Sequence, residues 1–548
     1  NTFEKAEELV EVAAQGSRNA VAALVIDRCP WCEHRFQAPH SYQVGSMKFR
    51  FLCTNTECAF GSDGEGVLPC NVVDEALYKE PPTLLIATID KFARLAWDDR
   101  PGCFFGVGSN RPPELIVQDE LHLVAGALGS VAGIYEAGLE TVLVQRGVYP
   151  KFVASTATIR MAENQVQRLY GKDVAVFPPP GIDCDDSFFA KTVPTSVRPG
   201  RLYIGYFAPM LNREKNMAPL AAALLAAPEQ LFPEGTQDRD ALLEAWWSQV
   251  VYHGSLKGVG NSHNAFNIGV REWFERLRRE SLQGSREAAE PDRQLTRDRP
   301  NIAQLTSVSS AEENAWTFAR LERPRVDDEC IDVLLATNMV SVGLDVGRLA
   351  LMVINGQPLT TAEYIQASSR VGRSEVPGVV LANYYRDQAR SLSHYENFRP
   401  YHESFYRFVE PTSITPFTRQ ARMRALHAGL VIAVRHVIHR LRGNESAGHF
   451  DPEDTAVAQV IEAYTRRCIR ADKERKEVIR AHIETLVGEW SLHAQNCIEQ
   501  RRQLCYQARA DDRSVERLLF NHDDRIRGTW PTLQSMRNVE DTGLLKAI

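Results

Sequence analysis

Two adjacent carboxylates, Asp119 and Glu120, are the side chains best placed to do chemistry in this chain. They lie in the segment Leu115-Ile-Val-Gln-Asp119-Glu120-Leu121-His122, in which a predicted apolar strand ends just before the acidic pair. A carboxylate at a strand end can hold Mg²⁺, usually through water, and its neighbour can polarise a water molecule as a general base. The pair therefore fits hydrolysis of a magnesium nucleotide, with a surface or capping role as the alternative of equal weight.

A second apolar run ends in small hydroxyl residues, in the segment Phe152-Val-Ala-Ser155-Thr156-Ala157-Thr158. These hydroxyl groups could hydrogen-bond the acidic pair, and Thr156 and Thr158 would then couple hydrolysis to movement. The alternative is a helix N-cap, which is a common use of serine and threonine.

Two arginines close the segment Tyr364-Ile-Gln366-Ala-Ser-Ser-Arg370-Val-Gly372-Arg373. We expect a helix here, on which a spacing of three places both guanidinium groups on one face, where they can reach anionic oxygens across a cleft. A solvated helix face is the ordinary alternative. Upstream, a further apolar strand leads into polar residues in Val333-Leu-Leu-Ala-Thr337-Asn338-Met339-Val340-Ser341-Val342-Gly343-Leu344-Asp345.

Four cysteines near the start have the spacing of a metal site. The pair Cys29-Pro-Trp-Cys32 is separated by twenty residues from Cys53-Thr-Asn-Thr-Glu-Cys58. Such an arrangement can close a tetrahedral Zn²⁺ site of the zinc-ribbon kind, and four thiolates leave no open position, so the metal would be structural. A disulfide or buried thiols are the alternatives, and Cys70 or His34 could replace one ligand.

Short apolar runs that alternate with helical stretches predict an α/β fold with parallel strands buried on both faces. The expected strands are Leu84–Ala87, Leu115–Val117, Phe152–Ala154, Gln249–Tyr252, Val333–Ala336, Leu349–Ile354 and Val379–Asn383. The charged stretch from Ser281 to Pro300 is predicted to be a solvated loop, and apolar residues at helical spacing beyond Pro416 predict an α-helical region.

The predicted domains follow from these patterns. They are a helical lead-in (1–28), a zinc-ribbon insertion (29–70), the C-terminal part of a first α/β domain (71–199), a second α/β domain (200–400) and a helical accessory domain (401–548). With 44% apolar and 24% charged residues, the composition is that of a folded globular protein rather than a disordered or fibrous one. The net charge of −7 argues against a uniformly basic coat, although a groove can still be locally basic. We find no signal peptide and no long uncharged apolar run, and therefore expect a cytoplasmic protein with no membrane partner.

In order and spacing, the four polar segments resemble motifs II, III, V and VI of the superfamily 2 helicases, over roughly residues 83 to 385. The resemblance implies two RecA-like parallel-sheet domains, the first incomplete, and the cofactors ATP, Mg²⁺ and Zn²⁺. Asp119 and Glu120 would form motif II, and Arg370 and Arg373 would stabilise the transition-state charge on the γ-phosphate across a cleft between the two domains.

The resemblance also implies roles for further residues. Gln366, Gly343 and Asp345 would contact ATP. The nucleic acid would contact Thr88 and Lys91 of the motif Ib-like segment Pro82–Lys91, Ser255 of the motif IV-like segment Val251–Ser255, and Thr337 and Asn338.

Two departures from the helicase pattern stand out. Ala367 and Ser369 replace the first arginine and the first glycine of motif VI, and no Gly-x-x-x-x-Gly-Lys-Ser/Thr phosphate-binding loop occurs in the sequence. The chain begins at Asn1. We expect the phosphate loop in sequence upstream of this residue, and a degenerate motor is the alternative.

The stretch Gln118-Asp-Glu-Leu-His-Leu-Val-Ala-Gly126-Ala-Leu-Gly129-Ser-Val-Ala-Gly133-Ile-Tyr135-Glu136, together with the early cysteine module, resembles the DrmA family, the helicases of DISARM anti-phage defence. This resemblance implies DNA as the substrate and a partner subunit of the DrmB type. The competing functions are a non-catalytic nucleic-acid-binding scaffold and an RNA helicase of the same superfamily.

Overall fold

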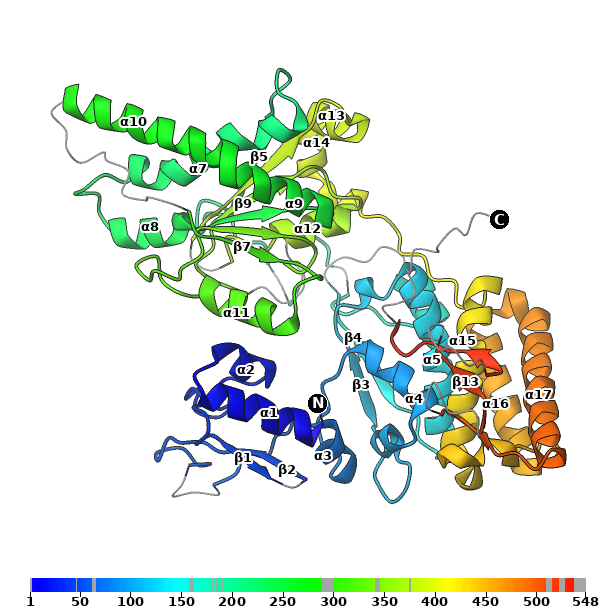
Figure 1. The fold of residues 1–548 in the computed structure, drawn as a ribbon. Helices are drawn as coiled ribbons and strands as arrows, with labels where there is room; N and C mark the ends of the chain where they lie inside the picture. Colours follow the sequence, from blue (N-terminus) through cyan, green and yellow to red (C-terminus); the bar gives the residue numbers. More distant parts are fainter. Residues whose placement is uncertain are drawn as a thin grey trace. The chain divides into compact units, whose positions relative to one another are not determined.

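The computed structural model divides the chain into two compact units, Asn1–Val72 with Pro178–Glu410 (unit 1) and Val73–Phe177 with Pro411–Ile548 (unit 2) (Figure 1). It describes residues 2–45, 47–61, 66–156, 162–179, 181–183, 186, 188–189, 191–287, 300–340, 345–373, 376–508, 515–521 and 528–536. The predicted Thr158 and Gly343 lie outside these residues. Each unit is described by itself.

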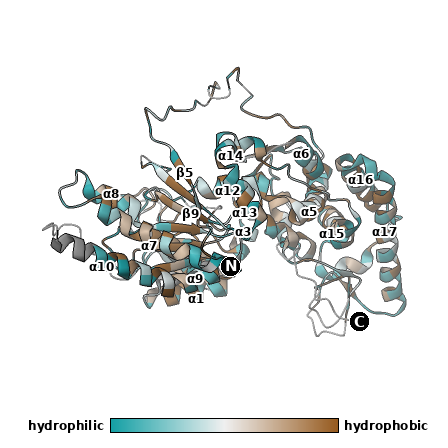
Figure 2. Cartoon of the chain, turned by 90° about the horizontal axis from the view of Figure 1, so that it is seen from above, coloured by the Kyte–Doolittle hydropathy of each residue, from teal (hydrophilic) through white to brown (hydrophobic). Residues whose placement is uncertain are grey.

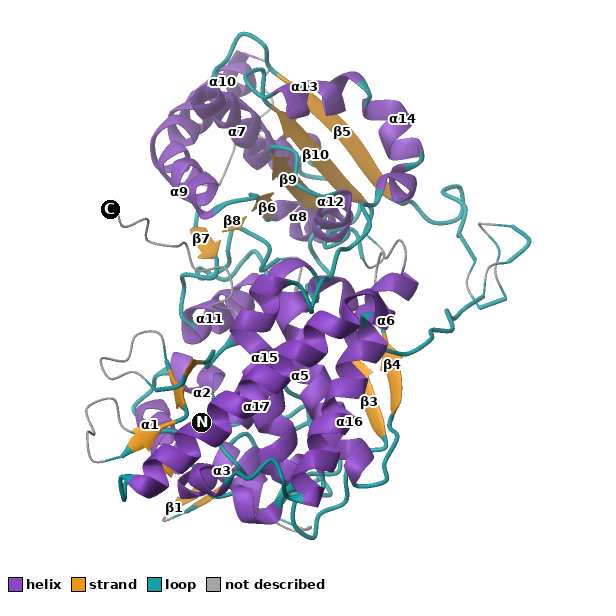
Figure 3. Ribbon diagram, turned by 90° about the vertical axis from the view of Figure 1, so that its right-hand side faces the viewer, coloured by secondary structure: helices purple, strands orange, loops and turns teal. Residues whose placement is uncertain are grey.

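The larger part of unit 1 is built on a six-stranded parallel sheet with the order β5-β10-β9-β6-β8-β7 (Figure 3). Its strands are β5 (Arg201–Phe207), β6 (Gln249–Tyr252), β7 (Ile302–Leu305), β8 (Val333–Ala336), β9 (Leu351–Asn355) and β10 (Gly378–Tyr384). Every residue of β6 and β8 is buried, as expected for strands covered on both faces. Figure 2 shows β5 and β9 in the colour of hydrophobic residues.

Alternate residues of these strands pack against two different layers of helices. Val251, Leu335 and Val353 join a core with the helices α7, α9 and α10, whereas Val250, Leu334 and Met352 join a core with α11 and α12. The helices are α7 (Arg213–Leu231), α8 (Arg239–Trp247), α9 (Leu256–Ala265), a π-helical turn (Phe266–Val270), α10 (Arg271–Glu287), α11 (Ala311–Leu321), α12 (Thr361–Ser368), α13 (Ala389–Glu396), α14 (Phe398–Glu403) and the 3-10 turn Phe405–Phe408. This is a three-layer α/β arrangement, as the apolar runs predicted.

The N-terminal part of unit 1 is a small module that begins with two helices. It consists of α1 (Phe3–Ala14), α2 (Arg18–Ala23) and an antiparallel hairpin of β1 (Tyr42–Gly45) and β2 (Lys48–Phe51). Aromatic side chains fill the hairpin's core, where the Phe36 ring stacks on Phe51 with 5.2 Å between centroids. Trp31 by contrast is exposed.

Unit 2 combines a two-stranded parallel sheet with a bundle of long helices. β3 (Leu115–Gln118) pairs with β4 (Lys151–Ala154). The helices are α3 (Asp74–Lys79), α4 (Arg94–Trp97), α5 (Gly126–Gln145), α6 (Ala162–Tyr170), α15 (Arg419–Val437), α16 (Thr455–Ala471) and α17 (Lys476–Glu499). The 3-10 turns are Ile89–Ala93, Arg100–Phe105, Leu121–Leu123, His439–Leu441, Asn444–His449 and Lys473–Arg475, and the short strands are β11 (Leu504–Cys505), β12 (Glu516–Arg517), β13 (Leu519–Phe520) and β14 (Trp530–Pro531).

Helices α5 and α15 form the centre of unit 2, where they belong to one hydrophobic core. They cross closely because two glycines face each other. A Cβ added to Gly138 would lie 2.7 Å from the carbonyl oxygen of Gly429, a distance that no side chain tolerates. Among the described residues, α5 is the one helix long and apolar enough to cross a membrane, but 83% of its most apolar window is buried inside the protein. Its hydropathy is that of a core helix.

Two secondary-structure predictions are wrong. Leu84–Ala87 forms no strand, Leu84 and Ile86 are exposed, and no strand among the described residues supplies the backbone hydrogen bonds that a strand needs. The loop predicted from Ser281 to Pro300 is wrong over its first residues, because α10 continues to Glu287, and residues 288–299 of this prediction lie outside the described residues. Good helix-forming residues such as Leu282, Gln283 and Arg286 explain the continuation.

Candidate functional site

The acidic pair of unit 2 lies beside the hydroxyl segment because β3 and β4 are parallel and end at paired residues. Gln118, the last residue of β3, pairs with Ala154, the last residue of β4. The Ser155 amide then donates to the Gln118 carbonyl at 3.0 Å, and the Leu121 amide to the Ser155 carbonyl at 2.9 Å. The two polar segments that follow the strands are therefore held together by backbone hydrogen bonds.

Asp119 accepts two hydrogen bonds on the same oxygen. The Ser155 hydroxyl donates to Oδ1, and the Glu120 amide donates to Oδ1 at 2.9 Å. Asp119 is exposed. Both bonds reach Oδ1, and an exposed carboxylate of this kind can hold Mg²⁺ through water.

Glu120 has a left-handed backbone conformation, with φ of 51°. A non-glycine residue in this region is uncommon and is found disproportionately at functional sites. Its carboxylate lies 3.5 Å from Nδ1 of the buried His122, and the same nitrogen lies 3.2 Å from the Thr156 hydroxyl. His122 thus links the predicted base to the predicted coupling residue.

The predicted hydrogen bond between the hydroxyl segment and the acidic pair is confirmed, and Ser155 supplies it, whereas His122 is a functional candidate that the sequence analysis did not single out. The signal for Ser155 lay in the two apolar runs, because residues that follow paired parallel strands at the same position become neighbours. His122 could not be found in this way, since its contact with Thr156 depends on the turn after Glu120.

The two nucleic-acid residues predicted near the start of unit 2 lie at the 3-10 turn Ile89–Ala93. Thr88 precedes this turn and is exposed. Lys91 is also exposed, and its ammonium pairs with Asp74 at 3.1 Å. The Lys91 charge would have to be shared between Asp74 and a bound phosphate.

In unit 1, the structure joins two of the residues predicted from motifs V and VI. The Arg373 guanidinium donates to Asp345 Oδ1 at 2.8 Å. An ion pair with such an exposed carboxylate adds little stability. Its effect is to hold the Arg373 side chain in one direction.

Arg370 and Arg373 do not share a helix, contrary to our prediction. Helix α12 ends at Ser368, and the chain then turns at Gly372, whose φ is 63°. A Cβ added to Gly372 would lie 2.5 Å from the Gly378 amide nitrogen, so the turn requires glycine. Arg201 supports the turn by donating to the carbonyls of Val371 at 2.7 Å and Ser369 at 3.1 Å.

The other predicted residues of unit 1 differ in exposure. Gln366 on α12 and Arg370 are both buried, with 8% and 9% exposed. Thr337 is buried, whereas its neighbour Asn338 presents its side chain to solvent. Ser255 caps α9, where its hydroxyl accepts a hydrogen bond from the Gly258 amide at 3.2 Å.

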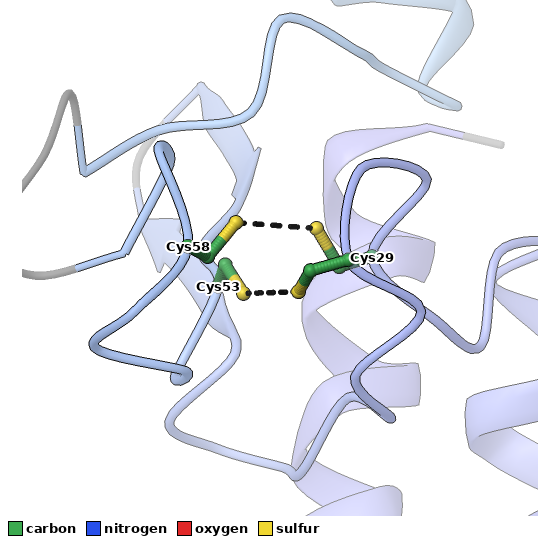
Figure 4. A group of neighbouring side chains, drawn as sticks. Cys29, Cys53 and Cys58 are labelled. Carbon is green, nitrogen blue, oxygen red and sulfur yellow. Dashed lines mark hydrogen bonds between the residues drawn. The ribbon is translucent and has the colours of Figure 1, made fainter.

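The four predicted cysteines meet in the N-terminal module (Figure 4). The sulfur atoms of Cys29 and Cys58 are 4.0 Å apart, those of Cys32 and Cys53 are 3.6 Å apart, and all four lie within 4.8 Å of one another. Thiolates held about 2.3 Å from one zinc ion in a tetrahedron are about 3.8 Å apart. The geometry therefore fits Zn²⁺, and neither Cys70 nor His34 belongs to the cluster.

Hydrogen-bond donors contact the sulfur atoms of Cys32 and Cys58. The Phe60 amide donates to Cys58 Sγ at 3.4 Å, and the Asn55 side chain to Cys32 Sγ at 3.7 Å. A backbone hydrogen bond from His34 lowers the pKa of Cys32 to about 7. Burial raises the pKa of Cys58 and raises that of Cys53 to about 12, so the donors lower the thiol pKa at Cys32 but do not outweigh burial at these two cysteines. The thiolate is the form that binds metal.

The sequence of this chain is similar to known proteins. The helicase conserved C-terminal domain matches residues 282–375. The DISARM protein DrmA of Bacillus paralicheniformis is 32% identical over 562 residues, which cover 94% of this chain and 48% of that protein. The resemblance to the DrmA helicases is confirmed. The chain spans about half the length of this relative.

Solved helicase structures are more distant. The DUF1998 helicase MrfA bound to DNA is 16% identical, with a TM-score of 0.44 over 65% of this chain and 40% of that one. The helicase Lhr of Mycobacterium smegmatis, bound to ssDNA and AMP-PNP, is 17% identical, with a TM-score of 0.41 over 74% of this chain and 42% of that one.

Proposed function

We propose that the protein is an ATP-dependent nucleic-acid translocase or helicase that acts on DNA in anti-phage defence. One structural observation carries the proposal: Asp119 and Glu120 follow β3 and are tied to the end of β4 through the Ser155 hydroxyl. Two adjacent carboxylates at a strand end support the proposal, because nucleotide hydrolysis needs groups that hold Mg²⁺ and orient the attacking water. The similarity to DrmA supports DNA and the defence context.

The residues divide the proposed chemistry between them. Asp119 holds Mg²⁺ and Glu120 orients the attacking water as general base. Arg370 and Arg373 stabilise the charge that develops on the phosphoryl oxygens, with Arg373 directed by Asp345. Gln366 and Gly343 complete the proposed ATP contacts.

Movement and strand binding fall to residues of both units. Thr156 and Thr158 couple hydrolysis to motion, and the contact between Thr156 and His122 supports this role. The proposed strand contacts are Thr88, Lys91, Ser255, Thr337 and Asn338.

The cysteine cluster holds a structural Zn²⁺ in this proposal. All four thiols are needed to complete a tetrahedron, so no position is left for a substrate. The sulfur distances support this role, because they match a common central ion without rearrangement. The metal then braces the hairpin of β1 and β2 against the turns that carry the cysteines.

Phosphate release from ATP by the full-length protein tests the proposal, measured with no nucleic acid, with single-stranded DNA and with single-stranded RNA of the same sequence. Turnover stimulated by DNA is the expected result. Stimulation by RNA alone identifies an RNA helicase. Binding of nucleic acid without turnover in any condition identifies the non-catalytic scaffold and contradicts the motor.

The cellular setting follows from the same proposal. A DISARM role implies action in the cytoplasm beside a DrmB-type partner subunit. Copurification with the product of a neighbouring gene, from cells that express both, is the expected result.

A further inference from the structure

A cavity of about 230 Å³ lies in unit 1 at the carboxyl ends of β6 and β9. Its walls include His253 and Ser255, which follow β6, and Asn355 and Gln357, which end and follow β9. The chain leaves β6 toward β7 and leaves β9 toward β10, which lie on opposite sides of this strand pair. The cavity, named here the β6–β9 cavity, is therefore at a topological switch point, where open parallel sheets bind ligands.

The size of the β6–β9 cavity limits what it can hold. Small-molecule pockets usually have volumes of roughly 300 to 1,000 Å³, so this one suits a single planar ring system better than a larger ligand. Gly254, one of the lining residues, is exposed, and a Cβ added there would meet no atom within 4 Å. A ring can therefore enter from solvent.

One wall of the cavity presents a guanidinium group supported by an aromatic ring. The Arg213 guanidinium lies 4.7 Å from the centre of the Tyr385 ring. That ring is itself seated against Gly356, where a Cβ would come within 2.8 Å of it. Arg213 is exposed, whereas Tyr385 is 3% exposed. A nucleobase can stack on a guanidinium plane held in this way.

Two buried polar atoms of residues that line the cavity have no hydrogen-bond partner among the described residues. They are Nε2 of His253, which is 2% exposed, and Oε1 of Gln357. The Asn355 amide nitrogen lies 3.4 Å from His253 Nδ1, so Nδ1 accepts and Nε2 carries the proton. Burial, with a smaller contribution from the Arg213 charge, lowers the pKa of His253 to about 4 and keeps the ring neutral. One donor and one acceptor beside the cavity are thus unpartnered, and the edge of a base can pair with one of each.

The rim of the cavity favours an anion. Helix α9 begins at Leu256 beside Ser255 and Gly254, and the N-terminus of a helix attracts phosphate. Arg213 adds a positive charge. Among the described residues that line the cavity, none carries a carboxylate.

We propose that the β6–β9 cavity binds one nucleotide, with its base stacked on Arg213 and facing His253 and Gln357, and its phosphate at the start of α9. The inference rests on the proposed function, since Ser255 is one of the residues proposed to contact the strand. The nucleotide comes either from a bound single strand, whose base is turned out of the stack, or from a free mononucleotide. Both sources share the same chemistry.

Fluorescence anisotropy with labelled oligodeoxyadenylate, oligothymidylate and an abasic oligomer of equal length tests this proposal. Stacking of a base contributes about 1 to 3 kcal/mol, so we expect the base-bearing oligomers to bind about tenfold more tightly than the abasic one. Arg213→Lys keeps the charge but removes the plane. It should reduce this preference while leaving the affinity for the abasic oligomer within about twofold.

Gln357→Ala should reduce the same preference through loss of an acceptor. The matched control is Gln304→Ala, at an exposed position of β7 in the same sheet, and it should change neither affinity. Equal reductions for base-bearing and abasic oligomers in Arg213→Lys would overturn the base-binding role. So would a preference that neither variant changes.

Two further outcomes separate this inference from the proposed function. If no oligomer binds, the motor proposal fails. If dAMP nevertheless binds and Arg213→Lys weakens it, the cavity is a site for a free nucleotide. Binding of the oligomers with no dependence on Arg213 or Gln357 supports the motor and contradicts the cavity.

Discussion

Replacement of Glu136 by glutamine should make unit 2 more stable above neutral pH and hardly change its stability in mild acid. Glu136 lies in the middle of α5 and is 4% exposed. Burial raises the pKa of this carboxyl to about 7, an effect that the Arg467 charge opposes and the Glu140 charge reinforces. The folded protein therefore retains a proton on Glu136 at pH values where the unfolded chain has lost it.

The size and sign of the effect follow from linkage. A folded pKa of about 7 against the ordinary value of 4.5 for a glutamate corresponds to up to about 3 kcal/mol. Because the folded pKa is the higher one, this stability is fully present below pH 4.5 and is lost as the pH rises through about 7. Glutamine cannot ionise, so the variant keeps its stability across this range.

Hydrogen exchange of the α5 amides, followed by mass spectrometry near pH 5 and pH 8, measures the local free energy of opening. The difference between the Glu136→Gln variant and the parent should be small near pH 5 and should reach up to about 3 kcal/mol near pH 8. Glu163→Gln, at an exposed position of α6, is the matched control. A difference between variant and parent that is the same at both pH values would refute the reasoning.

Three other predictions concern the zinc site, the core of unit 2 and the acidic pair. Cys32→Ser should abolish bound zinc measured by atomic emission, whereas Cys70→Ser should retain it, and zinc retained in the first variant would show a wrong ligand set. Glu140→Ala removes the buried partner of Arg467, Arg470 and Lys172, and it should lower the free energy of unfolding of unit 2 by roughly 3 to 5 kcal/mol; an unchanged urea midpoint would contradict this. Ser155→Ala removes one of the two hydrogen bonds to Asp119 Oδ1 and should raise the Mg²⁺ concentration needed for half-maximal ATPase activity, and an unaltered Mg²⁺ requirement would show that this hydrogen bond does not position Asp119.

The strands of the second α/β domain could be predicted because their side chains are apolar on both faces. Val333–Ala336 and Gln249–Tyr252 were predicted with the bounds that the structure shows. Leu84–Ala87 is similarly apolar, but no strand among the described residues pairs with it. An apolar composition alone does not predict strand pairing. Long-range packing was equally hidden, because the close approach of Gly138 to Gly429 joins residues far apart in the sequence.

The candidate sites could likewise be predicted only in part. The cysteine spacing was sufficient to predict the sulfur cluster, since two short turns leave the thiols few other partners. The spacing of Arg370 and Arg373 was not sufficient to predict their structure. Helix α12 ends at Ser368, and the turn that follows depends on the close approach of Gly372 to Gly378. The bond between Arg373 and Asp345 likewise depends on the tertiary fold.

The most direct test of the account is the rate of DNA-stimulated ATP hydrolysis by Glu120→Gln, compared with Glu114→Gln. Glu114 is an exposed glutamate at the opposite end of β3, where it pairs with Arg111 at 2.6 Å. A general base contributes about 10² to 10⁴ in rate, so Glu120→Gln should lose turnover by that factor and still bind ATP and DNA. Glu114→Gln should hydrolyse ATP like the parent. Turnover by Glu120→Gln at the parent rate would contradict the central claim that this carboxylate is the hydrolytic base.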